Sequence, residues 1–467
     1  MEKPKKILLF DLDGTLLRND KTLSEYTLEI LSKCKEHRYL IGISTSRSEQ
    51  NCLGFLREMK PDILISSGGA LVRANDKIIC SSSFSVTETK SFIETARDIC
   101  GMDCEITVDT LDAHYWNYKT NPKEQDKSWG DSIYTDFKDF KCEALKICVE
   151  IPNPNLAKEL CEHFSELDSQ RFSDGDWYKF TKSGITKEKA ILAVCEACHV
   201  NISDIVAFGD DYADIGMLKM CGIGVAMGNA IQEVKDIADD ITLSNEEDGV
   251  ATYLEKLIIY EHTKYMLKQK IKELFANDCS GHDYWHSIRV LNNAEKIAKT
   301  EKCDKYIVMI AALLHDTDDI KIFETKDYEN ARCIMLDCHL REDTINNVID
   351  IIKEISFKGT ETTSPKSIEG KIVQDADRLD AMGAIGIARA FAYGGNYNRA
   401  LHIPDCQPNV SMDETEYRNN KGTTINHFYE KLLLIKDMMN TDCAKVIAQK
   451  RDGYMRDFLK EFYDEWN

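Results

Sequence analysis

The stretch KILLFDLDGTLL, residues 6–17, decides the predicted fold of this chain. Its apolar run ends at acidic residues and a glycine, as a buried parallel strand does when it delivers side chains to the crevice at its carboxyl end. The pattern recurs in YLIGIST at 39–45, DILIS at 62–66 and DIVAFGDD at 204–211, and helical periodicity over 23–34 separates the first two strands. We therefore predict an α/β domain with a doubly wound, Rossmann-like sheet.

The remainder of the chain indicates two further regions. Between 77 and about 180, strand-like and helical stretches alternate less regularly, and Trp116, Trp129 and Trp177 appear. We interpret residues 81–180 as an inserted α/β cap, which leaves 1–80 and 181–257 for the core. The segment 244–276 has helical character and contains no proline, so a helix should join the two halves. Helical patterns dominate beyond it, and we predict an all-α domain over 258–467.

Length and composition limit what this protein can be. At 467 residues, with 43% hydrophobic and 30% charged residues, it is an ordinary globular chain that is too long for a single core. A net charge of −21 argues against a general nucleic-acid binder but not against small phosphorylated substrates, whose charge is met locally. No secretory signal fits the amino-terminal sequence, and no apolar stretch approaches the roughly 20 residues that span a bilayer. We expect a cytoplasmic protein without a membrane partner.

The 17 cysteines are scattered along the chain, which favours small apolar residues over disulfides or metal ligands. One group, CEACH from Cys195 to His199, has the spacing of a c-type haem attachment site. Such attachment belongs outside the cytoplasm, and the segment has the pattern of an amphipathic helix. We therefore reject the haem interpretation.

The motif DLDGT places Asp11 and Asp13 two residues apart at a strand end, beside a glycine that permits a tight turn. Such a pair can divide phosphate chemistry, because one carboxylate attacks phosphorus and the other passes a proton to the leaving oxygen. The same motif also occurs in surface turns and calcium loops, so its neighbours in the sequence decide between these interpretations.

Five phrases in the first 257 residues together resemble the haloacid-dehalogenase (HAD) superfamily of phosphatases, and within it the Cof-like branch. They are DLDGTLL at 11–17, ISTSR at 43–47, GITKEKAI at 184–191, GDDYADIGML at 209–218 and GVAMGNA at 224–230. The long insertion after the second phrase stands where this branch carries an α/β cap. The resemblance implies small phosphorylated metabolites as substrates.

By this resemblance, Asp11 is the nucleophile that becomes an aspartyl phosphate, and Asp13 is the general acid and later the general base. Thr45 and Lys187 would bind the phosphoryl oxygens as their charge redistributes. Lys189 is a rival to Lys187 for the third motif.

The same resemblance implies a Mg²⁺ ion, which favours hard oxygen ligands and retains several waters. Its expected ligands are the Asp11 carboxylate, the Asp13 backbone carbonyl and the Asp210 carboxylate. Asp211 or Asp214 would support them, and we take Asp214 as the ligand.

Three positions depart from the usual pattern of the branch. Ser46 and Glu188 stand where glycine is usual, and Ala213 stands where asparagine is usual. The first two should alter backbone fit only, whereas Ala213 removes a side chain that helps to hold the metal-site loop, so modest activity is expected. Arg47 and Asn229, which lie within two of the five phrases, are expected to bind substrate.

A second set of ionisable residues follows in helical segments. GHDYWHSIRV at 281–290 puts His282 and His286 on one helical face, and ALLHDTDD at 312–319 ends an apolar helix at His315 and Asp316. VQDADRLDA at 373–381 places three aspartates in another helix. Imidazole and carboxylate together can hold a divalent transition metal with open positions for water.

The order of these motifs resembles the HD phosphohydrolase superfamily over about residues 262–467. The resemblance implies one metal, Mn²⁺, Fe²⁺, Ni²⁺, Zn²⁺ or Mg²⁺, which would lower the pKa of a bound water and polarise a phosphate. The implied ligands are His286, His315, Asp316 and Asp377. Members of the superfamily hydrolyse nucleotides, cyclic dinucleotides or alarmones, so nucleotides are the expected substrates.

Other residues near these motifs have two interpretations each. Asp319 is placed like the carboxylate that orients water in related nucleotidases, or it is a solvated charge at a helix end. Arg289, one turn along from the first histidine ligand, would bind phosphate or form a structural ion pair. His282, Lys358 and Arg378 are weaker candidates of the same kind.

The sequence therefore predicts a bifunctional, metal-dependent phosphohydrolase. The HAD half would act on small metabolites through an aspartyl phosphate, and the HD half would act on nucleotides. Three alternatives remain: a non-catalytic, nucleotide-sensing HD domain that regulates the first site, an HD domain that mainly mediates assembly, and an inactive first domain. Homo-oligomerisation through the HD domain stays open in each.

Overall fold

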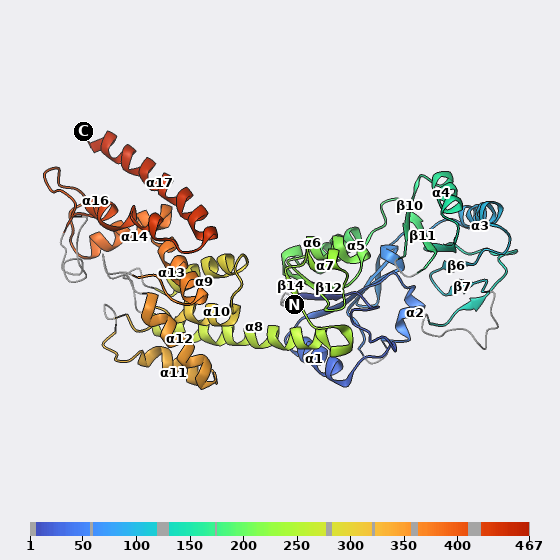
Figure 1. Cartoon of the computed structure of the whole chain (residues 1–467), viewed down its shortest axis with the longest axis horizontal. Helices are drawn as coiled ribbons and strands as arrows, with labels where there is room; N and C mark the ends of the chain where they lie inside the picture. The colour runs from blue at the N-terminus through green and yellow to red at the C-terminus, as the bar shows by residue number, and fades with distance from the viewer. Residues whose placement is uncertain are drawn as a thin grey trace. The chain divides into compact units, whose positions relative to one another are not determined.

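The computed structural model describes residues 6–56, 59–118, 130–172, 175–276, 283–319, 323–355, 363–409 and 422–466. The chain forms two compact units, Met1–Ile258 and Ile259–Asn467. Their boundary falls inside the long helix α8 (Gly249–Leu274), so a helix joins the two halves as predicted (Figure 1).

An eight-stranded sheet forms the core of the first unit, in the order β14-β13-β12-β1-β2-β3-β4-β5. Neighbouring strands run parallel from β14 to β3, and β4 and β5 continue the sheet in antiparallel pairs. The strands are β1 Ile7–Phe10, β2 Leu40–Ser44, β3 Ile63–Ser66, β4 Leu71–Ala74, β5 Lys77–Ser81, β12 Ile205–Gly209, β13 Ile223–Ala226 and β14 Asp240–Ile241. The doubly wound α/β fold and the four predicted strands are confirmed.

Polar caps start the helices that surround this sheet. The Ser24 side chain accepts a hydrogen bond from the Thr27 amide at the start of α1, and Thr186 accepts one from Lys189 at the start of α5. Lys187 thereby becomes the first residue of α5. The helices are α1 Glu25–Glu36, α2 Glu49–Leu53, α5 Lys187–Cys198, α6 Ile215–Met220 and α7 Gln232–Lys235.

The predicted helix through CEACH is the carboxyl-terminal part of α5, which ends at His199 in the left-handed conformation with φ of 54°. All 16 cysteines in the described ranges are free thiols. The position of this segment within α5 agrees with the predicted amphipathic helix.

A second sheet, in the order β10-β11-β9-β6-β7-β8, forms the cap. One of its faces packs against the cap helices through an apolar cluster that includes Phe92, Ile147 and Phe180. Its last strand, β11, runs two residues past the predicted end of the insertion at 180. The elements are α3 Val86–Cys100, β6 Ile106–Asp109, β7 His114–Trp116, β8 Ile133–Tyr134, β9 Lys146–Glu150, α4 Pro154–His163, β10 Leu167–Arg171 and β11 Trp177–Lys182.

The described parts of the second unit contain helices and no strand, which confirms the predicted all-α domain. Helix α10 is apolar over its whole circumference, and α9, α12 and α13 pack around it. The helices are α9 Tyr284–Ala298, α10 Lys305–Leu314, α11 Glu329–Asp337, α12 Glu342–Ile355, α13 Ile368–Asp380, α14 Gly383–Asn396, α16 Thr424–His427 and α17 Asp442–Trp466. None of the helices within the described ranges combines the length and apolar character that a membrane crossing requires.

One buried carboxylate fixes the start of α17 against α13. Asp375 is fully buried and accepts hydrogen bonds from the amides of Asn440 and Thr441, at 2.9 and 2.8 Å, and from both of their side chains. Because its acceptors are all used in this way, Asp375 is a structural residue rather than a metal ligand.

We expect Asp375→Ala to lower the free energy of local unfolding around α13 and α17 by about 2–4 kcal/mol, because buried amide donors would lose their acceptor. Hydrogen exchange of α13 and α17 peptides in the full chain measures this quantity. Asp350→Ala, which removes an exposed carboxylate paired with Lys353 on α12, is the control and should change it by less than about 0.5 kcal/mol. Equal effects of the two changes would contradict the assigned role.

Candidate active sites

The DLDGT loop leaves the carboxyl end of β1 and packs closely against the loop after β12. The Asp11 amide donates to the carbonyl of Phe208. Gly14 adopts a φ of +74°, and a Cβ atom there would lie 2.3 Å from Oδ2 of Asp210. Only glycine therefore allows the two acidic loops to approach this closely.

Three carboxylates gather where these loops meet. One oxygen each of Asp11, Asp210 and Asp214 lies within 4.8 Å of the others. Lys187 Nζ lies 2.6 Å from Oδ1 of Asp11 and 2.8 Å from Oδ1 of Asp214. The structure thus brings Lys187 to the predicted nucleophile, whereas its rival Lys189 lies beside Gly184.

The charge balance of this cluster suits a divalent cation. Burial, and next the charge of Asp214, raise the pKa of Asp11 well above its usual range although Lys187 opposes them. Burial also raises the pKa of Asp210 to about 7. Three crowded carboxylates with one ammonium need further positive charge, and hard oxygen donors fit Mg²⁺. Asp11, Asp210 and Asp214 are the side chains that would hold it.

The Asp13 carboxylate forms ion pairs with two cations, Arg47 and Lys21. Arg47 donates hydrogen bonds to both carboxylate oxygens, with Nε 2.5 Å from Oδ2 and Nη2 2.6 Å from Oδ1. Lys21 Nζ lies 2.7 Å from Oδ1. Burial opposes ionisation of Asp13, yet the hydrogen bonds and charges of Arg47 and Lys21 lower its pKa. Arg47 therefore lies beside the predicted acid–base residue, and Lys21 is a neighbour that the motifs did not reveal.

The remaining predicted residues hold the loops around this cluster. The Thr45 hydroxyl is buried and accepts from the Arg47 amide at 3.1 Å, which leaves its own proton available to donate. Asn229 donates to the carbonyl of Gly14 at 2.7 Å and accepts from the amide of Asn245 at 3.0 Å. The structure thus gives both ends of the Asn229 amide backbone partners, so this side chain clamps the DLDGT loop.

The loop around Ala213 is capped by its neighbours. Asp211 accepts from the Tyr212 amide at 2.7 Å, and Oδ2 of Asp214 accepts from the Asp210 and Asp211 amides. Asp214, and not Asp211, also belongs to the acidic cluster. These bonds hold the loop without an asparagine at position 213.

We expect the Mg²⁺ affinity of this site to fall at least about tenfold from pH 8 to pH 6, because Asp210 contributes one proton and the raised pKa of Asp11 can only add to the fall. Below the pKa of about 7 that burial gives Asp210, binding must release a proton, and above it the carboxylate is already free. Isothermal titration of the His315→Ala, Asp316→Ala chain, in buffers of different ionisation enthalpy, measures affinity and proton release together. An affinity independent of pH would contradict the expected linkage.

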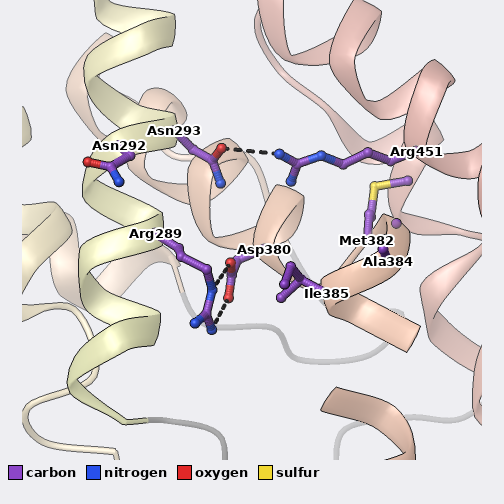
Figure 2. A pocket seen from close by; sticks show the side chains of 9 residues that line it. Arg289, Asn292, Asn293, Asp380, Met382, Ala384, Ile385 and Arg451 are labelled. Atoms are coloured by element: carbon purple, nitrogen blue, oxygen red, sulfur yellow. Dashed lines mark hydrogen bonds and ion pairs between the residues drawn. The ribbon is translucent and has the colours of Figure 1, made fainter. Parts of the chain in front are cut away.

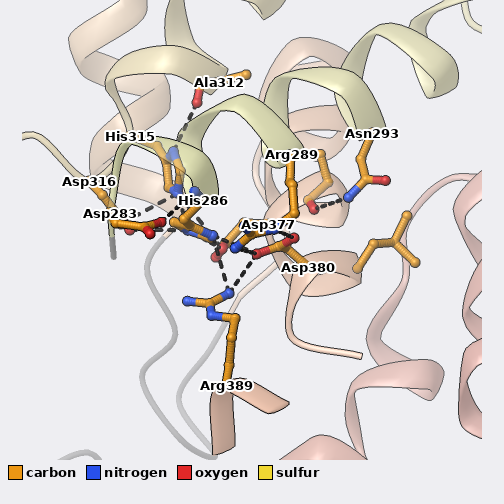
Figure 3. A network of polar contacts seen from close by, with 12 residues as sticks. Asp283, His286, Arg289, Asn293, Ala312, His315, Asp316, Asp377, Asp380 and Arg389 are labelled. Atoms are coloured by element: carbon orange, nitrogen blue, oxygen red, sulfur yellow. Dashed lines mark hydrogen bonds and ion pairs between the residues drawn. The ribbon is translucent and has the colours of Figure 1, made fainter. Parts of the chain in front are cut away.

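The four predicted ligands of the second unit converge on one point (Figure 3). His286 Nε2 lies 3.1 Å from His315 Nε2 and 3.2 Å from Oδ2 of Asp316. Oδ1 of Asp377 lies 3.4 Å from His286 Nε2 and 3.7 Å from His315 Nε2. Both imidazoles are buried, whereas the Asp377 side chain is 39% exposed. The cluster therefore has one open side.

The hydrogen bonds behind the two imidazoles fix their tautomers. His315 Nδ1 lies 2.9 Å from the carbonyl of Ala312, and His286 Nδ1 lies 2.7 Å from Oδ2 of Asp380, so each Nδ1 carries a proton that it donates. The two Nε2 atoms then face each other and two further carboxylates. Burial opposes protonation of both imidazoles, yet the carboxylates of Asp316 and Asp377 raise the pKa of His286 and of His315. A divalent transition metal would take the place of these protons, and this mixed nitrogen and oxygen set fits one.

Asp380 is a contact that the sequence patterns did not reveal. Besides His286, its carboxylate binds Arg289 through Nε at 2.7 Å and Nη2 at 3.0 Å, and Arg389 Nη1 at 2.7 Å (Figure 3). Burial opposes ionisation, yet His286 and Arg289 lower the pKa of Asp380 to about 2. A buried carboxylate behind a ligand histidine orients the imidazole and raises its basicity. Arg289 thus forms the ion pair that the sequence allowed, and its binding of phosphate stays a prediction.

The three aspartates of α13 thus have different surroundings. Asp375 caps α17, Asp377 reaches the ligand cluster, and Asp380 lies behind it. Asp377 and Asp380 lie three residues apart on one helical face, and this spacing was the signal in the sequence that could have placed Asp380 near the ligand cluster. No spacing identified Arg389, because it lies on a different helix, α14.

Of the other predicted residues of this half, Asp319 and Arg378 do not belong to the described ligand cluster. Asp319 follows in the same turn, with its amide donating to the Asp316 carbonyl at 3.1 Å, but the described ligand cluster does not include its carboxylate. Arg378 is buried and donates to the carbonyl of Met438. His282 and Lys358 lie outside the described residues.

A pocket of about 400 Å³ adjoins Asp380 (Figure 2). Arg289, Asn292 and Asn293 from α9 form one side, and Arg451 from α17 reaches across to Asn293. Asp380 lines this pocket, whereas the four predicted ligands do not. The pocket and the ligand cluster thus share one positioning carboxylate.

We expect Asp380→Asn to weaken binding of Mn²⁺ at the second site about 10- to 100-fold, because the amide cannot hold His286 as a charged acceptor. Isothermal titration of the full chain carrying Asp11→Asn isolates this site from the first. Asn292→Ala, on the opposite wall of the pocket, is the control and should leave the affinity unchanged. Equal affinities of the Asp380→Asn chain and its parent would contradict the positioning role.

The fold and the two clusters define a metal-dependent phosphohydrolase with an acidic site in one unit and a histidine–aspartate site in the other. The chain belongs to the haloacid dehalogenase-like hydrolases, whose family model matches residues 8–254, and an HD domain matches residues 284–382. Both resemblances are confirmed, and the chain is a hydrolase of phosphate esters.

Particular relatives cover the two halves separately. The uncharacterized protein YpgQ of Bacillus subtilis is 37% identical over 195 residues, which cover 41% of this chain and 87% of that protein. The 5-amino-6-(5-phospho-D-ribitylamino)uracil phosphatase YitU of Bacillus subtilis is 28% identical over 271 residues, which cover 55% of this chain and 98% of that protein. A crystal structure of a haloacid dehalogenase-like hydrolase from Bacteroides thetaiotaomicron, 24% identical, covers 54% of this chain and 99% of its own, with a TM-score of 0.49.

Proposed function

We propose that this protein is bifunctional, with one catalytic phosphohydrolase site in each compact unit. The observation that carries the proposal is that each unit contains its own buried cluster of metal-ligating side chains, Asp11, Asp210 and Asp214 in one and His286, His315 and Asp316 in the other. A domain that only senses nucleotides or only mediates assembly has no need of a complete ligand set with an open side.

In the first site, Asp11 is the nucleophile. An oxygen of Asp11 forms a bond to phosphorus, the bond from phosphorus to the ester oxygen breaks, and that oxygen takes a proton from Asp13. Asp13 then removes a proton from the water that cleaves the aspartyl phosphate. Lys187, 2.6 Å from Asp11, and the Thr45 hydroxyl bind the phosphoryl oxygens. A bound Mg²⁺ would supply further positive charge to the same oxygens.

The pairing of Asp13 with Arg47 and Lys21 has a consequence for this chemistry. These two cations keep Asp13 ionised, whereas donation to the leaving oxygen requires its protonated form. Both cations must therefore shift from Asp13 to the phosphoryl oxygens of the substrate. Arg47 thus acts as a substrate-binding residue that releases Asp13 when the phosphate enters.

Small phosphorylated metabolites are the substrates we propose for this half. Relatives named as 5-amino-6-(5-phospho-D-ribitylamino)uracil phosphatases support this class, since the substrate in their name is a phosphate monoester on a polyol chain. The −21 net charge is compatible with it because the cluster of Lys21, Arg47 and Lys187 meets the phosphate locally.

In the second site, His286, His315, Asp316 and Asp377 would hold Mn²⁺ or another of the divalent metals named above. Such a metal supplies a nucleophilic water at neutral pH. Asp377, on the open side of the cluster, is where a phosphate would approach, and Asp319 in the neighbouring turn is the residue we propose to orient the water. Nucleotides are the proposed substrate class.

Two variants separate the sites in an assay of phosphate release from sugar phosphates and nucleotides, with Mg²⁺ and separately with Mn²⁺. We expect Asp11→Asn to lose the metabolite esters by at least ~10³-fold, and His315→Ala, Asp316→Ala to lose the nucleotides to a similar extent. Each variant should retain the substrates that the other loses.

The chain offers a matched control for each variant. Asp20→Asn changes an exposed carboxylate near the DLDGT loop, and the double change Asp337→Ala, His339→Ala removes an exposed aspartate and histidine of the second unit. If the His315→Ala, Asp316→Ala chain loses no substrate and nucleotides only change the rate of the first site, the second domain is a sensor and bifunctionality is rejected.

A further inference from the structure

The cap sheet has two buried faces of opposite character. Side chains alternate along each strand, so that Ile147, Val149 and Phe180 enter the apolar cluster under α3 and α4. Lys146, Lys179 and Thr181 alternate with them on the other face and are also buried. A buried polar face is costly unless its groups have partners, so each of its charges needs an explanation.

This polar face lies on the loops that shape the first active site. Lys146 Nζ donates to the carbonyl of Ser46 at 2.5 Å, between Thr45 and Arg47 in the second HAD motif. The Ser67 hydroxyl, at the end of β3, donates to Oδ2 of Asp109 at 2.8 Å. The polar face therefore borders the groups proposed to bind the phosphoryl oxygens.

Most cations in this region already have carboxylate partners. Lys21 and Arg47 pair with Asp13, Lys187 pairs with Asp11 and Asp214, and Lys146 lies 2.8 Å from Oδ2 of Asp109. Lys179 differs, because no hydrogen bond or ion pair joins its ammonium to any residue in the described ranges. Its side chain is nonetheless only 9% exposed.

The position of Lys179 points its ammonium toward the active-site loops. A Cβ atom on Gly68, in the turn after β3, would lie 3.1 Å from Lys179 Nζ. Burial, then the charges of Lys146 and Lys187, lower the pKa of Lys179 to about 8, and the attraction of Glu188 is weaker than either repulsion. Two repulsions and a weaker attraction from Glu188 leave this ammonium short of negative charge, which a bound anion would supply.

We propose that Lys179 binds a second acidic group of the substrate, a carboxylate or another phosphate, on the part that leaves when the phosphoryl group is transferred. The inference rests on the proposed function of the first site and names its substrate class. Thr181, two residues along on the same face, has a buried hydroxyl without a partner among the described residues, and it would add a hydrogen bond to the same group.

Two matched pairs of phosphate esters test this subsite in the full chain. They are 3-phosphoglycerate with glycerol 3-phosphate, and 6-phosphogluconate with sorbitol 6-phosphate, and within each pair a carboxylate replaces a hydroxymethyl group. We expect the wild-type chain to prefer the acidic member of at least one pair. Lys179→Met should lower kcat/KM for that ester about 10- to 100-fold, mainly through KM, and change the alcohol no more than about twofold.

Two further variants separate recognition from folding. Lys179→Arg should retain the preference. Lys182→Met removes another ammonium of the same strand, one that pairs with Glu88, and should leave the preference unchanged. Lys179→Met should not lower the melting temperature, because it removes a buried cation without a partner and leaves a side chain of similar shape. Equal losses on both members of a pair, or no preference in the wild-type chain, would overturn the inference.

A binding measurement distinguishes failure of this inference from failure of the proposed function. Isothermal titration of the Asp11→Asn chain with the same esters requires no turnover. If the wild-type chain hydrolyses none of them, the proposed chemistry is wrong for these esters. The subsite is still supported if the acidic member of a pair binds more tightly and Lys179→Met abolishes that preference. Equal binding of both members overturns it.

Discussion

The rest of the structure depends on acceptor groups held together in two buried places. Carboxylates of Asp11, Asp210 and Asp214 meet in one unit, and two imidazole lone pairs meet two carboxylates in the other. Such groups repel one another unless a cation lies between them, so the folded chain must press them together through contacts elsewhere. Both units belong to families whose hydrolases depend on metal ions.

The two units use different means to hold these groups. In the first, the carboxyl ends of parallel strands deliver the aspartates, and Gly14 allows one loop to pass within contact distance of Asp210. In the second, the ligands lie on three helices packed around one another, and hydrogen bonds from behind fix the rings. Ala312 holds His315, and Asp380 holds His286. Helices offer no shared edge, so the second site depends more on such supporting contacts.

Much of the fold, and the residues that gather in the two clusters, could be predicted because the signals are local. The apolar runs before Asp11 and Asp210 indicate buried strands from the sequence alone. The part of α10 from Ile307 to Leu314 consists entirely of apolar residues, which indicates a buried helix. The same local signals do not decide between two residues that fit a motif equally well. Lys187 and Lys189 lie on the same turn of α5, and only the packing of that helix decides which one reaches Asp11.

The sequence by itself determined the strands, the helices and the order of the motifs, because side-chain periodicity and chain order are properties of neighbouring residues. Only the tertiary structure decided the partners of Asp13, the position of Arg389 behind His286, and the lack of a hydrogen bond or ion pair at the Lys179 ammonium among the described residues. Each of these features depends on residues that are distant in the chain. Arg47 and Asp13 form one such pair, and His286 and Asp380, which are 94 residues apart, form another. Electrostatic partnership depends on distance in space, and a linear pattern does not contain that distance.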